Sequence, residues 1–459
     1  MTDSAPVELR FFAGTLEVRG AEADLLAVRA LLHVDPRAGC HRAPAAAYPD
    51  VVLGLRAAGV PVQDGARRWR PLTLSVREPT PPRPYQQEAL RGWQEAGRRG
   101  VVVLPTGAGK TLVAVLAIAD VQRPALVVAP TLELVRQWSG VLANAFGVPI
   151  GVVGGGEHKV EALTVTTYDS AWMQMPHLGD RFALLVFDEA HHLPSDAYQS
   201  AATMALAPYR LGLTATPERT DGQHERYAHL CGPIVHRAEI VELSGLWLAD
   251  YDTERVLVDL DDDERALFEE ARACYRGFCA DAGVRLGDPD GFARFLRLGG
   301  RSPEGREALA AYRLQRRLAF GSRAKLRRLG ELLQRFAHEP TLIFTDDNAT
   351  AYSISRRFLV PVITHQTRLR ERVELLAGLR GGRYGAVVTS RVLNEGVDVP
   401  EAAVAIVVSG TGTVREHVQR LGRVLRKVPG KRALLVELVS ADTGETQTSA
   451  RRRDHIAYR

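Results

Sequence analysis

Short runs rich in apolar and β-branched residues alternate with longer amphipathic stretches over much of the chain. Such runs occur at Val101–Leu104, Ala125–Ala129, Leu163–Thr167 and Ala183–Phe187. A run of this length, bounded by turn residues, is typical of a strand that is buried on both faces. Strands that alternate with helical stretches indicate a parallel sheet whose ligands lie at the carboxyl ends of the strands. The pattern therefore predicts an α/β fold and places any chemistry at those strand ends.

The pattern differs on the amino-terminal side of this region. Residues 1–78 form a first unit without a catalytic constellation, in which Leu9–Val18 is typical of short strands and Ala21–Leu32 of a helix. A cluster of prolines then predicts an extended connector, because proline disfavours helix in the residue before it. These prolines are Pro79, Pro81, Pro82 and Pro84.

A second change in the pattern occurs between about Asp261 and Phe320. Apolar residues recur there at helical spacing, which predicts a helical insertion. Its aromatic residues fit a small core better than exposed wedges that stack on bases, because large aromatic side chains are mostly buried. The recurring positions are Leu267, Phe268, Ala271, Tyr275 and Phe278.

The composition allows several buried cores and a polyanionic partner. The chain has 459 residues, of which 46% are hydrophobic, and this suits roughly three domains of ordinary size. The formal charge is +5 and the sequence pI is about 9.1. These values fit nucleic acid binding, although a basic soluble protein without such a partner has them too.

Cysteine usage and the lack of long apolar runs bear on the compartment. Cys40, Cys231, Cys274 and Cys279 show no metal-ligand spacing, so we expect free thiols rather than a disulfide framework. The first ten residues lack an apolar signal core, and no run of about 18 apolar residues occurs. We therefore expect a cytoplasmic protein without membrane contact.

The strongest local motif follows the first apolar run. Residues 104–111 read Leu-Pro-Thr-Gly-Ala-Gly-Lys-Thr and precede the apolar stretch Leu112–Val121, which is the order strand, glycine-rich turn, helix. In such a turn backbone N–H groups close around phosphates, lysine reaches the terminal phosphates and threonine takes magnesium. The full phosphate-loop pattern asks for glycine at Leu104, so an ordinary loop stays an alternative for this motif alone.

Two acidic residues end another predicted strand. Asp188 suits a magnesium contact made through water, and Glu189 suits orienting the water that attacks the terminal phosphate. An ordinary helix N-terminus also favours such carboxylates, but the upstream phosphate loop favours the catalytic interpretation. The adjacent His191 and His192 lack a third ligand for a metal site.

Several short motifs occur in the order that they have in superfamily two helicases. The first half of the chain resembles the first motor domain of that superfamily at Arg83-Pro84-Tyr85-Gln86, Gly107–Thr111, Asp188–His191 and Thr214–Thr216. The second half resembles the second motor domain at Thr341–Thr345, Asn394–Asp398 and Gln419–Arg426. Their joint occurrence is a specific signal, because each added motif lowers the chance of a false match.

Within the superfamily the chain is similar to the XPB type, in particular to its compact prokaryotic forms. The family has an Arg-Glu-Asp element after its Thr-Ala-Thr motif, and this element is linked to DNA unwinding. Here it reads Arg219-Thr220-Asp221, so a hydroxyl replaces the central carboxylate. The resemblance to the XPB type is carried by the accessory unit before the motor and by Thr216–Gly222, Asp263–Arg265, Tyr275–Phe278 and Ala319–Lys325.

The resemblance implies an α/β protein with two RecA-like parallel-sheet motor domains, a small N-terminal accessory domain and a helical thumb-like insertion. ATP and Mg²⁺ are the implied cofactors, with ATP in the cleft between the motor domains and DNA across their upper surface. The expected boundaries are 1–78 for the accessory domain, which resembles a damage-recognition domain, 79–252 for the first motor domain, 253–320 for the insertion and 321–459 for the second motor domain.

The matching positions receive roles in ATP hydrolysis. Arg83 and Gln86 are expected to read adenine, since an amide can both donate to and accept from one adenine edge. Thr111 and Asp188 are expected to hold magnesium, while Glu189 positions water. Asp398 is expected to hold a ribose hydroxyl, and Arg423 and Arg426 complete the transition state when the domains close. The implied nucleotide-binding set is Arg83, Gln86, Thr106, Gly107, Ala108, Gly109, Lys110, Thr111 and Asp398, with Lys110 also counted as catalytic.

Other positions are expected to contact DNA or to couple it to ATP. Hydroxyls at Thr131, Thr167 and Thr389 resemble the family's backbone-contacting motifs and would bind phosphate without reading sequence. Arg136 is a further candidate, and a solvated helix arginine is the alternative. Coupling is assigned to Thr214, Thr216 and Gln419, and unwinding to the element at 219–221.

The implied activity is that of an ATP-dependent DNA helicase or translocase, moving 3′ to 5′, in repair or transcription. Forked, single-stranded or damaged duplex DNA is the expected partner. Two alternatives stay open: an ATP-regulated DNA clamp or remodelling factor without processive unwinding, and a motor that works with a separate nuclease. The chain shows no obvious nuclease triad of its own.

Overall fold

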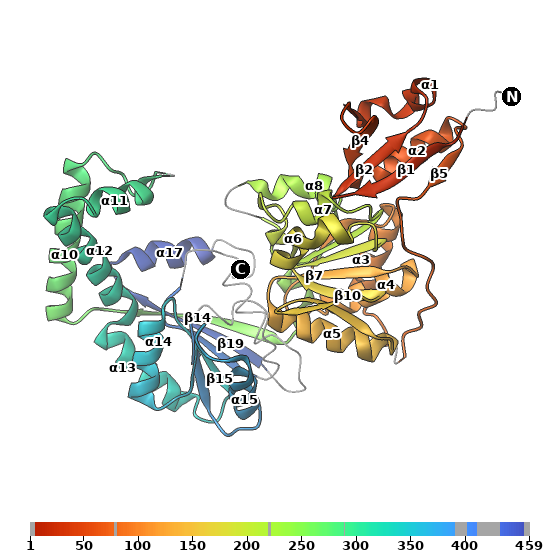
Figure 1. Ribbon diagram of the computed structural model, residues 1–459. Coiled ribbons are helices and arrows are strands. Elements are labelled where there is room, and N and C mark those ends of the chain that lie inside the picture. Colours follow the sequence, from red (N-terminus) through yellow and green to blue (C-terminus); the bar gives the residue numbers. More distant parts are fainter. Residues whose placement is uncertain are drawn as a thin grey trace. The chain divides into compact units, whose positions relative to one another are not determined.

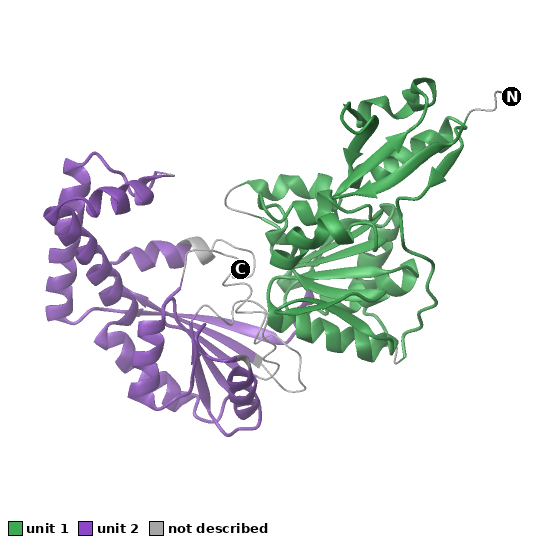
Figure 2. Ribbon diagram, viewed as in Figure 1, with its two compact units in different colours: residues 1–242 green, residues 243–459 purple. Residues whose placement is uncertain are grey.

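The structure is a computed structural model that describes residues 5–77, 80–218, 222–288, 290–390, 402–410 and 432–453. The chain divides into two compact units, residues 1–242 and 243–459, and each contains a parallel sheet with helices around it (Figures 1 and 2). The predicted α/β class is therefore confirmed.

The larger sheet of the first unit is built from the apolar runs of the sequence. Its strand order is β13-β6-β12-β11-β7-β10-β8-β9, and all neighbours are parallel except β8 and β9. The predicted runs Ala125–Ala129 and Leu163–Thr167 coincide with two of its strands. The strands are β6 (Arg99–Val103), β7 (Ala125–Ala129), β8 (Ile150–Gly154), β9 (Glu157–Lys159), β10 (Leu163–Thr167), β11 (Leu184–Asp188), β12 (Tyr209–Thr214) and β13 (Ile234–Arg237).

Helices cover this sheet because both of its faces are apolar. Alternate residues of the central strands, such as Val103, Val128 and Phe187, form one core cluster with Tyr168 and Met175. Tyr168 and Met175 belong to α6, so α6 covers that face of the sheet. The helices and 3-10 turns of this region are α3 (Pro84–Glu95), α4 (Lys110–Val121), α5 (Leu132–Phe146), α6 (Tyr168–Leu178), η3 (Ala190–His192), α7 (Ser200–Thr203), η4 (Gln223–Arg226), α8 (Tyr227–Leu230) and α9 (Ile240–Leu243).

A buried arginine fixes strand β12 to its neighbours. The side chain of Arg210 is fully buried and donates hydrogen bonds to the carbonyl oxygens of Ala202, Ala205, Ala207 and Leu230 at 2.7–3.3 Å. Burial lowers the pKa of Arg210 to about 9, which still leaves the guanidinium charged at neutral pH. These carbonyls belong to the segments around α7 and α8, so one side chain holds both segments against the strand that ends at Thr214.

The amino-terminal domain is a small sheet that packs on the same unit. Its strand order is β3-β4-β2-β1-β5, and β1 pairs with β2 in an antiparallel hairpin that turns at Gly14. A Cβ added at Gly14 would lie 2.8 Å from Met204 Cγ, so the turn touches the segment after α7. The predicted helix at 21–32 consists of one α turn and a 3-10 helix. The elements are β1 (Val7–Phe12), β2 (Thr15–Arg19), α1 (Glu22–Leu25), η1 (Leu26–Leu31), β3 (His33–Asp35), β4 (Cys40–Pro44), η2 (Ala45–Ala47), α2 (Tyr48–Ala57) and β5 (Val62–Asp64).

The connector from this domain is held against the larger sheet by hydrogen bonds. Arg68 pairs with Asp180 at 2.8 Å. Gln122, in left-handed conformation with φ 53°, exchanges two hydrogen bonds with Leu74 through its amide, at 2.7 and 2.8 Å. Further along, the N–H of Arg77 donates to the carbonyl oxygen of Ala145 at 2.8 Å. The connector is therefore an ordered segment held against the first unit. The sequence predicted that it is extended but not these contacts.

Replacing Gln122 with alanine should detach the connector around Leu74 from the rest of the first unit. The substitution leaves the N–H and carbonyl of Leu74 without their amide partners, which costs about 1–3 kcal/mol for partly buried groups. Trypsin cleavage after Arg70, followed by mass spectrometry, should then be roughly tenfold faster. Gln63→Ala removes an exposed amide from β5 and should leave the cleavage rate unchanged. Equal rates in the two variants would show that Gln122 does not hold the connector.

The second unit contains a six-stranded sheet of order β14-β19-β18-β15-β17-β16, in which all neighbours are parallel. Residues 253–258, which the sequence places in the insertion, belong to the edge strand β14 of this sheet. The strands are β14 (Asp250–Val258), β15 (Thr341–Phe344), β16 (Val362–Ile363), β17 (Ala386–Thr389), β18 (Val404–Val407) and β19 (Arg432–Ser440). The helices around them are α13 (Arg323–Arg335), α14 (Asn348–Phe358), α15 (Leu369–Arg380) and α17 (Gly444–Arg453).

The helical insertion lies between β14 and α13 in the chain, and its helices are α10 (Asp262–Asp281), α11 (Gly291–Gly299) and α12 (Pro303–Gly321). Tyr275 and Phe295 are buried in its small core, and the ring of Tyr312 lies 5.4 and 5.6 Å from theirs. The expectation that these aromatic residues form a core is confirmed for Phe268 and Tyr275, whereas Leu267 is exposed.

The carboxyl-terminal helix α17 is fastened by a buried ion pair. Lys325 Nζ lies 2.5 Å from Glu445 Oε2 and also donates to the carbonyl oxygen of Val408 at 2.8 Å. The same carboxylate oxygen accepts the N–H of Ser440 at 2.9 Å. Lys325 is fully buried and Glu445 is 4% exposed, so this pair joins the start of α13 to the start of α17 inside the protein.

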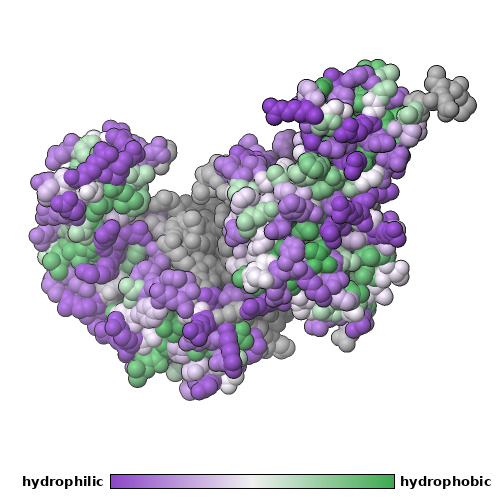
Figure 3. All heavy atoms as spheres, viewed as in Figure 1, coloured by the Kyte–Doolittle hydropathy of each residue, from purple (hydrophilic) through white to green (hydrophobic). Residues whose placement is uncertain are grey.

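The surface exposes both hydrophilic and hydrophobic residues. On the face seen in Figure 3, hydrophilic and hydrophobic side chains are interspersed over each unit. Among the described residues, no helix combines the length and the apolar character that crossing a membrane requires.

Candidate functional site

Five adjacent strands of the first unit bring the predicted site segments to one edge. Strands β6, β12, β11, β7 and β10 are parallel neighbours, so their carboxyl ends lie side by side. The segments that follow them contain the glycine-rich loop, Thr214, Asp188, Thr131 and Thr167, in that order. The N–H of Leu104 donates to the carbonyl oxygen of Thr214 at 3.0 Å, which joins the first two segments directly.

The glycine-rich loop has the backbone that its sequence predicts. Gly107 and Gly109 have φ of 86° and 78°, values that L side chains rarely adopt. Helix α4 begins at Lys110, whose Nζ donates to the carbonyl oxygens of Leu104 at 3.1 Å and Pro105 at 3.4 Å. The hydroxyl of Thr106 is buried and has no hydrogen-bond partner among the described residues. The loop thus presents backbone N–H groups, a lysine and an unsatisfied hydroxyl at a helix N-terminus.

The predicted adenine-reading residues contact this loop. Gln86 Nε2 donates to the carbonyl oxygen of Ala108 at 2.9 Å, while its Oε1 accepts the N–H of Arg83 at 2.9 Å. Tyr85 supports the loop as well, since its hydroxyl donates to the same oxygen of Ala108 at 2.9 Å. A Cβ at Gly109 would lie 2.5 Å from Gln86 Nε2, so glycine is needed for this close packing. The Gln86 amide therefore positions the loop backbone.

The acidic pair lies at the carboxyl end of β11, and Asp188 is held on three sides. Its Oδ2 accepts the indole N–H of Trp138 at 2.8 Å, its Oδ1 accepts the N–H of Glu189 at 3.0 Å, and its carbonyl oxygen accepts the hydroxyl of Tyr168 at 2.9 Å. Glu189 is 7% exposed and has φ 46°, a left-handed conformation that costs a non-glycine residue about 1–2 kcal/mol. Such local strain is concentrated at functional sites.

A histidine links the acidic pair to the next strand. His191 is fully buried, and its Nδ1 lies 3.3 Å from Thr214 Oγ1 and 3.5 Å from Glu189 Oε2. Thr214 Oγ1 in turn accepts the N–H of Thr216 at 3.2 Å. The predicted coupling residues Thr214 and Thr216 are thus connected to Glu189 through one imidazole. The roles of His191 and Trp138 were not apparent from the sequence, because their partners lie 23 and 50 residues away.

The predicted DNA-contacting threonines of this unit cap two helices. Thr131 Oγ1 accepts the N–H of Leu134 at the start of α5, and Thr167 Oγ1 accepts the N–H of Ser170 at the start of α6. Both helix N-termini lie at the same sheet edge, and helix N-termini favour anions. Arg136 is exposed on α5.

In the second unit only part of the predicted site can be placed. Thr389 ends β17, is fully buried and donates its hydroxyl to the carbonyl oxygen of Ser390 at 2.9 Å. The other predicted residues of this unit, Asp398, Gln419, Arg423 and Arg426, lie outside the described ranges. So does the predicted unwinding element of the first unit, Arg219, Thr220 and Asp221.

None of the four cysteines is among the residues that form this site. All four cysteines are free, as predicted, and burial raises the pKa of Cys231 to about 12, so its thiol is not ionised at neutral pH. Within the described ranges, no group of three or more His, Cys, Asp or Glu side chains has the arrangement of a metal cluster.

Comparison with known families matches three parts of the chain. Residues 9–66 match the Xeroderma pigmentosum group B helicase damage recognition domain, and residues 329–458 match the ERCC3/RAD25/XPB C-terminal helicase. Residues 80–219 match the model of the Type III restriction enzyme, res subunit. A relative from Sulfurisphaera tokodaii, the DNA 3′-5′ translocase XPB2, is 44% identical over 81% of this chain and 84% of its own length. The chain belongs to the XPB family of helicases.

A further relative agrees with the XPB assignment, and solved structures share the fold. The DNA 3′-5′ helicase XPB of Kineococcus radiotolerans is 32% identical over 82% of this chain and 62% of its own length. The Pyrococcus furiosus Hef helicase domain has a TM-score of 0.55 and 19% identity, covering 80% of this chain and 97% of that one. Dbp5 of S. cerevisiae, bound to RNA and ADP BeF3, has a TM-score of 0.57 and 15% identity, covering 82% and 88%. The structural likeness shows the RecA-like fold, and the predicted XPB resemblance is confirmed.

Proposed function

We propose that this XPB-family chain is a DNA motor that couples ATP hydrolysis to 3′ to 5′ movement and duplex unwinding, in repair or transcription. One observation carries the proposal: the glycine-rich loop, Thr214 and the acidic pair lie at adjacent strand ends. There the Leu104 N–H donates to the carbonyl oxygen of Thr214, and the His191 imidazole lies between Thr214 and Glu189. The relatives named as a DNA 3′-5′ translocase and a DNA 3′-5′ helicase support the polarity. The chain is thus an ATP-dependent enzyme of the helicase class.

The residues of the first unit fit a magnesium nucleotide. Gly107 and Gly109 have positive φ values that disfavour side chains there, and Thr106 offers a buried hydroxyl without a partner in the described structure. Thr111 and Asp188 supply the oxygen ligands that Mg²⁺ prefers, and such a site needs few protein ligands because phosphates complete it. When bound, the magnesium ion neutralises phosphate charge that develops during hydrolysis.

Different residues of the chain then bind the phosphates, orient the water and stabilise charge during ATP hydrolysis. Lys110 and the loop N–H groups bind the terminal phosphates, and the Glu189 carboxylate orients the attacking water. Arg423 and Arg426 complete the charge stabilisation from the second unit, since a guanidinium suits spreading phosphoryl charge. Asp398 holds the ribose. Arg83 and Gln86 read adenine in this proposal, with Gln86 also supporting the loop backbone.

Movement along DNA is assigned to residues at strand ends of both sheets. Thr131, Thr167 and Thr389, with Arg136, contact the phosphate backbone without reading sequence. Thr214, Thr216 and Gln419 couple this contact to ATP, and the His191 imidazole extends the link to Glu189. The element at 219–221 acts in unwinding, with a hydroxyl at Thr220 in place of a carboxylate.

The domain assignment belongs to the same proposal. Residues 1–78 act in recognition of distorted DNA, 79–252 and 321–459 are the motor domains, and 253–320 form the thumb-like insertion, although β14 extends into the last range. A separate nuclease as partner and a cytoplasmic location complete the proposal.

Trp138→Phe should weaken the affinity of the enzyme for Mg²⁺ without removing the catalytic carboxylate. Phenylalanine cannot donate to Asp188 Oδ2, so this oxygen loses the hydrogen bond that orients it. Loss of such a supporting contact typically costs 10–100-fold in metal affinity or activity. We expect the Mg²⁺ concentration for half-maximal ATP hydrolysis to rise by roughly tenfold. Trp172→Phe, at a partly exposed position on α6, is the matched control, and an unchanged Mg²⁺ titration for Trp138→Phe would refute the role.

A strand-displacement assay separates the proposed helicase from its alternatives. Forked duplexes with only a 3′ or only a 5′ tail are incubated with ATP, and a triplex-displacement substrate is run in parallel. Displacement from the 3′-tailed fork supports the helicase. Triplex displacement without strand separation supports a translocase. If DNA stimulates ATP turnover but neither displacement is seen, the ATP-regulated clamp is supported.

A further inference from the structure

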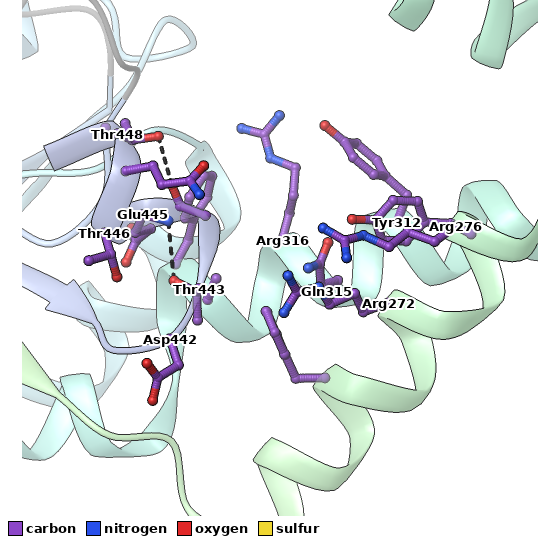
Figure 4. A pocket seen from close by; sticks show the side chains of 17 residues that line it. Arg272, Arg276, Tyr312, Gln315, Arg316, Asp442, Thr443, Glu445, Thr446 and Thr448 are labelled. Atoms are coloured by element: carbon purple, nitrogen blue, oxygen red, sulfur yellow. Dashed lines mark hydrogen bonds between the residues drawn. The ribbon is translucent and has the colours of Figure 1, made fainter. Parts of the chain in front are cut away.

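Pockets lined by arginines occur in both units of the chain. The cleft shown in Figure 4 lies between the helical insertion and the segment 442–448, so it belongs to the thumb-like element assigned above. A second pocket, of about 440 Å³, lies in the first unit and contains no residue of the helicase motifs. Its walls are the connector between Arg68 and Leu72, the turn before β10, and Arg181. We call it the connector pocket.

The connector pocket lies at the sheet edge opposite to the candidate ATP site. Pro124 and Ala162 line it, and they directly precede β7 and β10. The glycine-rich loop and the acidic pair instead follow the carboxyl ends of β6 and β11. Strands of five residues separate the two edges by roughly 15 Å. A ligand of this pocket is therefore distinct from the nucleotide and from the strand-end contacts proposed above.

Three arginines from two segments line the pocket. Arg68 and Arg70 belong to the connector, and Arg181 follows α6. Arg68 pairs with Asp180 at 2.8 Å. Arg70 and Arg181 are exposed, and neither guanidinium forms a hydrogen bond or salt bridge with another residue that the structure describes. Two guanidinium groups are thus available to one ligand, and the third needs only to share its carboxylate.

The nearby carboxylates do not cancel this charge. Glu161 lines the pocket but pairs with Lys159 at 3.2 Å. The Asp180 side chain is 3% exposed and lies outside the lining. Three arginines and one lysine are thus set against two carboxylates. The pocket therefore keeps a positive potential, which concentrates anions.

The backbone around Arg70 is fixed on both sides. The N–H of Arg68 donates to the carbonyl oxygen of Asp180 at 2.9 Å. The N–H of Leu72 donates to the carbonyl oxygen of Gln122, also at 2.9 Å. Arg70 lies between these two attachments. A ligand would thus bind a segment that is already ordered, which lowers the entropic cost of binding.

The lining favours a phosphate group over other anions and over a base. The planar fork of arginine matches phosphate oxygens, and a phosphate offers several acceptor oxygens to arginines from different directions, whereas a carboxylate offers only two. Trp69 also lines the pocket, but its ring packs edge-on against Tyr48 with 6.0 Å between the centroids. This ring therefore belongs to the core of the amino-terminal domain. The groups left for a ligand are the guanidinium groups.

We propose that the connector pocket binds a phosphate group through Arg70, Arg181 and Arg68. Its volume of about 440 Å³ lies within the range of small-ligand sites, about 300–1,000 Å³. A bound phosphate joins the connector to the sheet edge and so holds the amino-terminal domain in place. A free oligophosphate and the backbone of DNA both carry this group. With DNA as its source the site rests on the proposed function, and with a free oligophosphate it is independent of it.

The test uses the full chain and two double variants of equal charge. Arg70→Gln with Arg181→Gln is the pocket variant. Arg37→Gln with Arg91→Gln is the control variant, which removes two exposed arginines of the same unit that do not line the pocket. Inorganic tripolyphosphate is titrated while hydrogen–deuterium exchange of the connector amides is followed. This readout is local, so binding of tripolyphosphate at the distant glycine-rich loop does not disturb it.

Tripolyphosphate should slow exchange around Arg70 in the wild-type chain and in the control variant. The pocket variant should need roughly tenfold more tripolyphosphate for the same protection, because it loses two charge-assisted contacts at exposed positions. Both variants should keep the wild-type Tm, since all four side chains are exposed. Arg70→Lys with Arg181→Lys keeps the charge without the fork and should give an intermediate affinity. No protection in the wild-type chain, or equal curves for the pocket and control variants, would overturn the phosphate site.

A second titration with duplex DNA identifies the source of the phosphate. Protection of the connector by both ligands, lost together in the pocket variant, assigns the site to the DNA backbone. Protection by tripolyphosphate alone assigns it to a free oligophosphate. If the wild-type chain binds no DNA in fluorescence anisotropy, the proposed function fails, while the tripolyphosphate titration still decides whether the phosphate site exists.

Discussion

Glu189→Gln should abolish ATP turnover while leaving ATP binding intact. The amide keeps the volume of the carboxylate but cannot accept a proton from the attacking water, and general-base catalysis of this kind contributes about 10²–10⁴ in rate. Glu189 stands in a left-handed backbone conformation beside Asp188 and within 3.5 Å of His191, so its carboxylate is positioned rather than free to rotate. Steady-state phosphate release measures the loss, and a fluorescent ATP analogue measures binding.

The matched control for this variant is Glu157→Gln, which changes an exposed glutamate of β9 in the same unit. Turnover should be unaffected there. If Glu189→Gln retains a rate within a few-fold of wild type, another residue orients the water and our assignment of the catalytic carboxylate is wrong.

Lys325→Met should destabilise the second unit by about 3–5 kcal/mol, because it leaves the Glu445 carboxylate buried without its cation. The carbonyl oxygen of Val408 loses its donor at the same time. For a unit of this size such a change lowers Tm by roughly 10 °C. Calorimetry of the full chain measures the shift in the transition that belongs to this unit.

A double variant tests whether the pair itself is responsible. Lys325→Met with Glu445→Gln removes both charges and should recover a substantial part of the lost stability, since replacing a whole buried pair costs far less than breaking it. Arg370→Met breaks an exposed pair with Glu374 on α15 and should cost less than about 0.5 kcal/mol. A Tm for Lys325→Met that matches the Arg370→Met variant would mean that the ion pair contributes nothing to the attachment of α17.

The strands of the motor sheets were predictable because their apolar runs are buried on both faces. Ala125–Ala129 and Leu163–Thr167 coincide with β7 and β10, since hydrophobic burial alone decides such segments. Residues 253–258 of the edge strand β14 were assigned to the helical insertion instead. None of its residues is fully buried, and its pairing with β19 joins segments far apart in the chain.

The site residues were predictable where a local motif carries them. The glycine-rich loop and the acidic pair follow from spacing, because their chemistry needs contiguous residues. The contacts of Trp138, His191 and Arg210 were not predictable, since each of these side chains contacts residues of another element. Arg210 shows the limit most clearly, because arginine is expected at the surface, yet here four carbonyl oxygens compensate its burial.

The two hydrogen bonds of the Gln86 amide were also not predictable from the sequence. Its amide was expected to face adenine, and the structure shows it bonded to Ala108 and Arg83. The sequence predicts that Gln86 belongs to the nucleotide site, but it does not say which hydrogen bonds the side chain makes to the protein itself. The side-chain geometry supplies that distinction.

The central claim is that ATP hydrolysis at the glycine-rich loop is coupled to DNA. Steady-state ATP hydrolysis by the full chain, measured with and without single-stranded or forked DNA, tests this most directly. The account predicts a rate that rises several-fold with DNA in the wild-type chain and stays at background in Glu189→Gln under both conditions. A wild-type rate that is the same with and without DNA would contradict it.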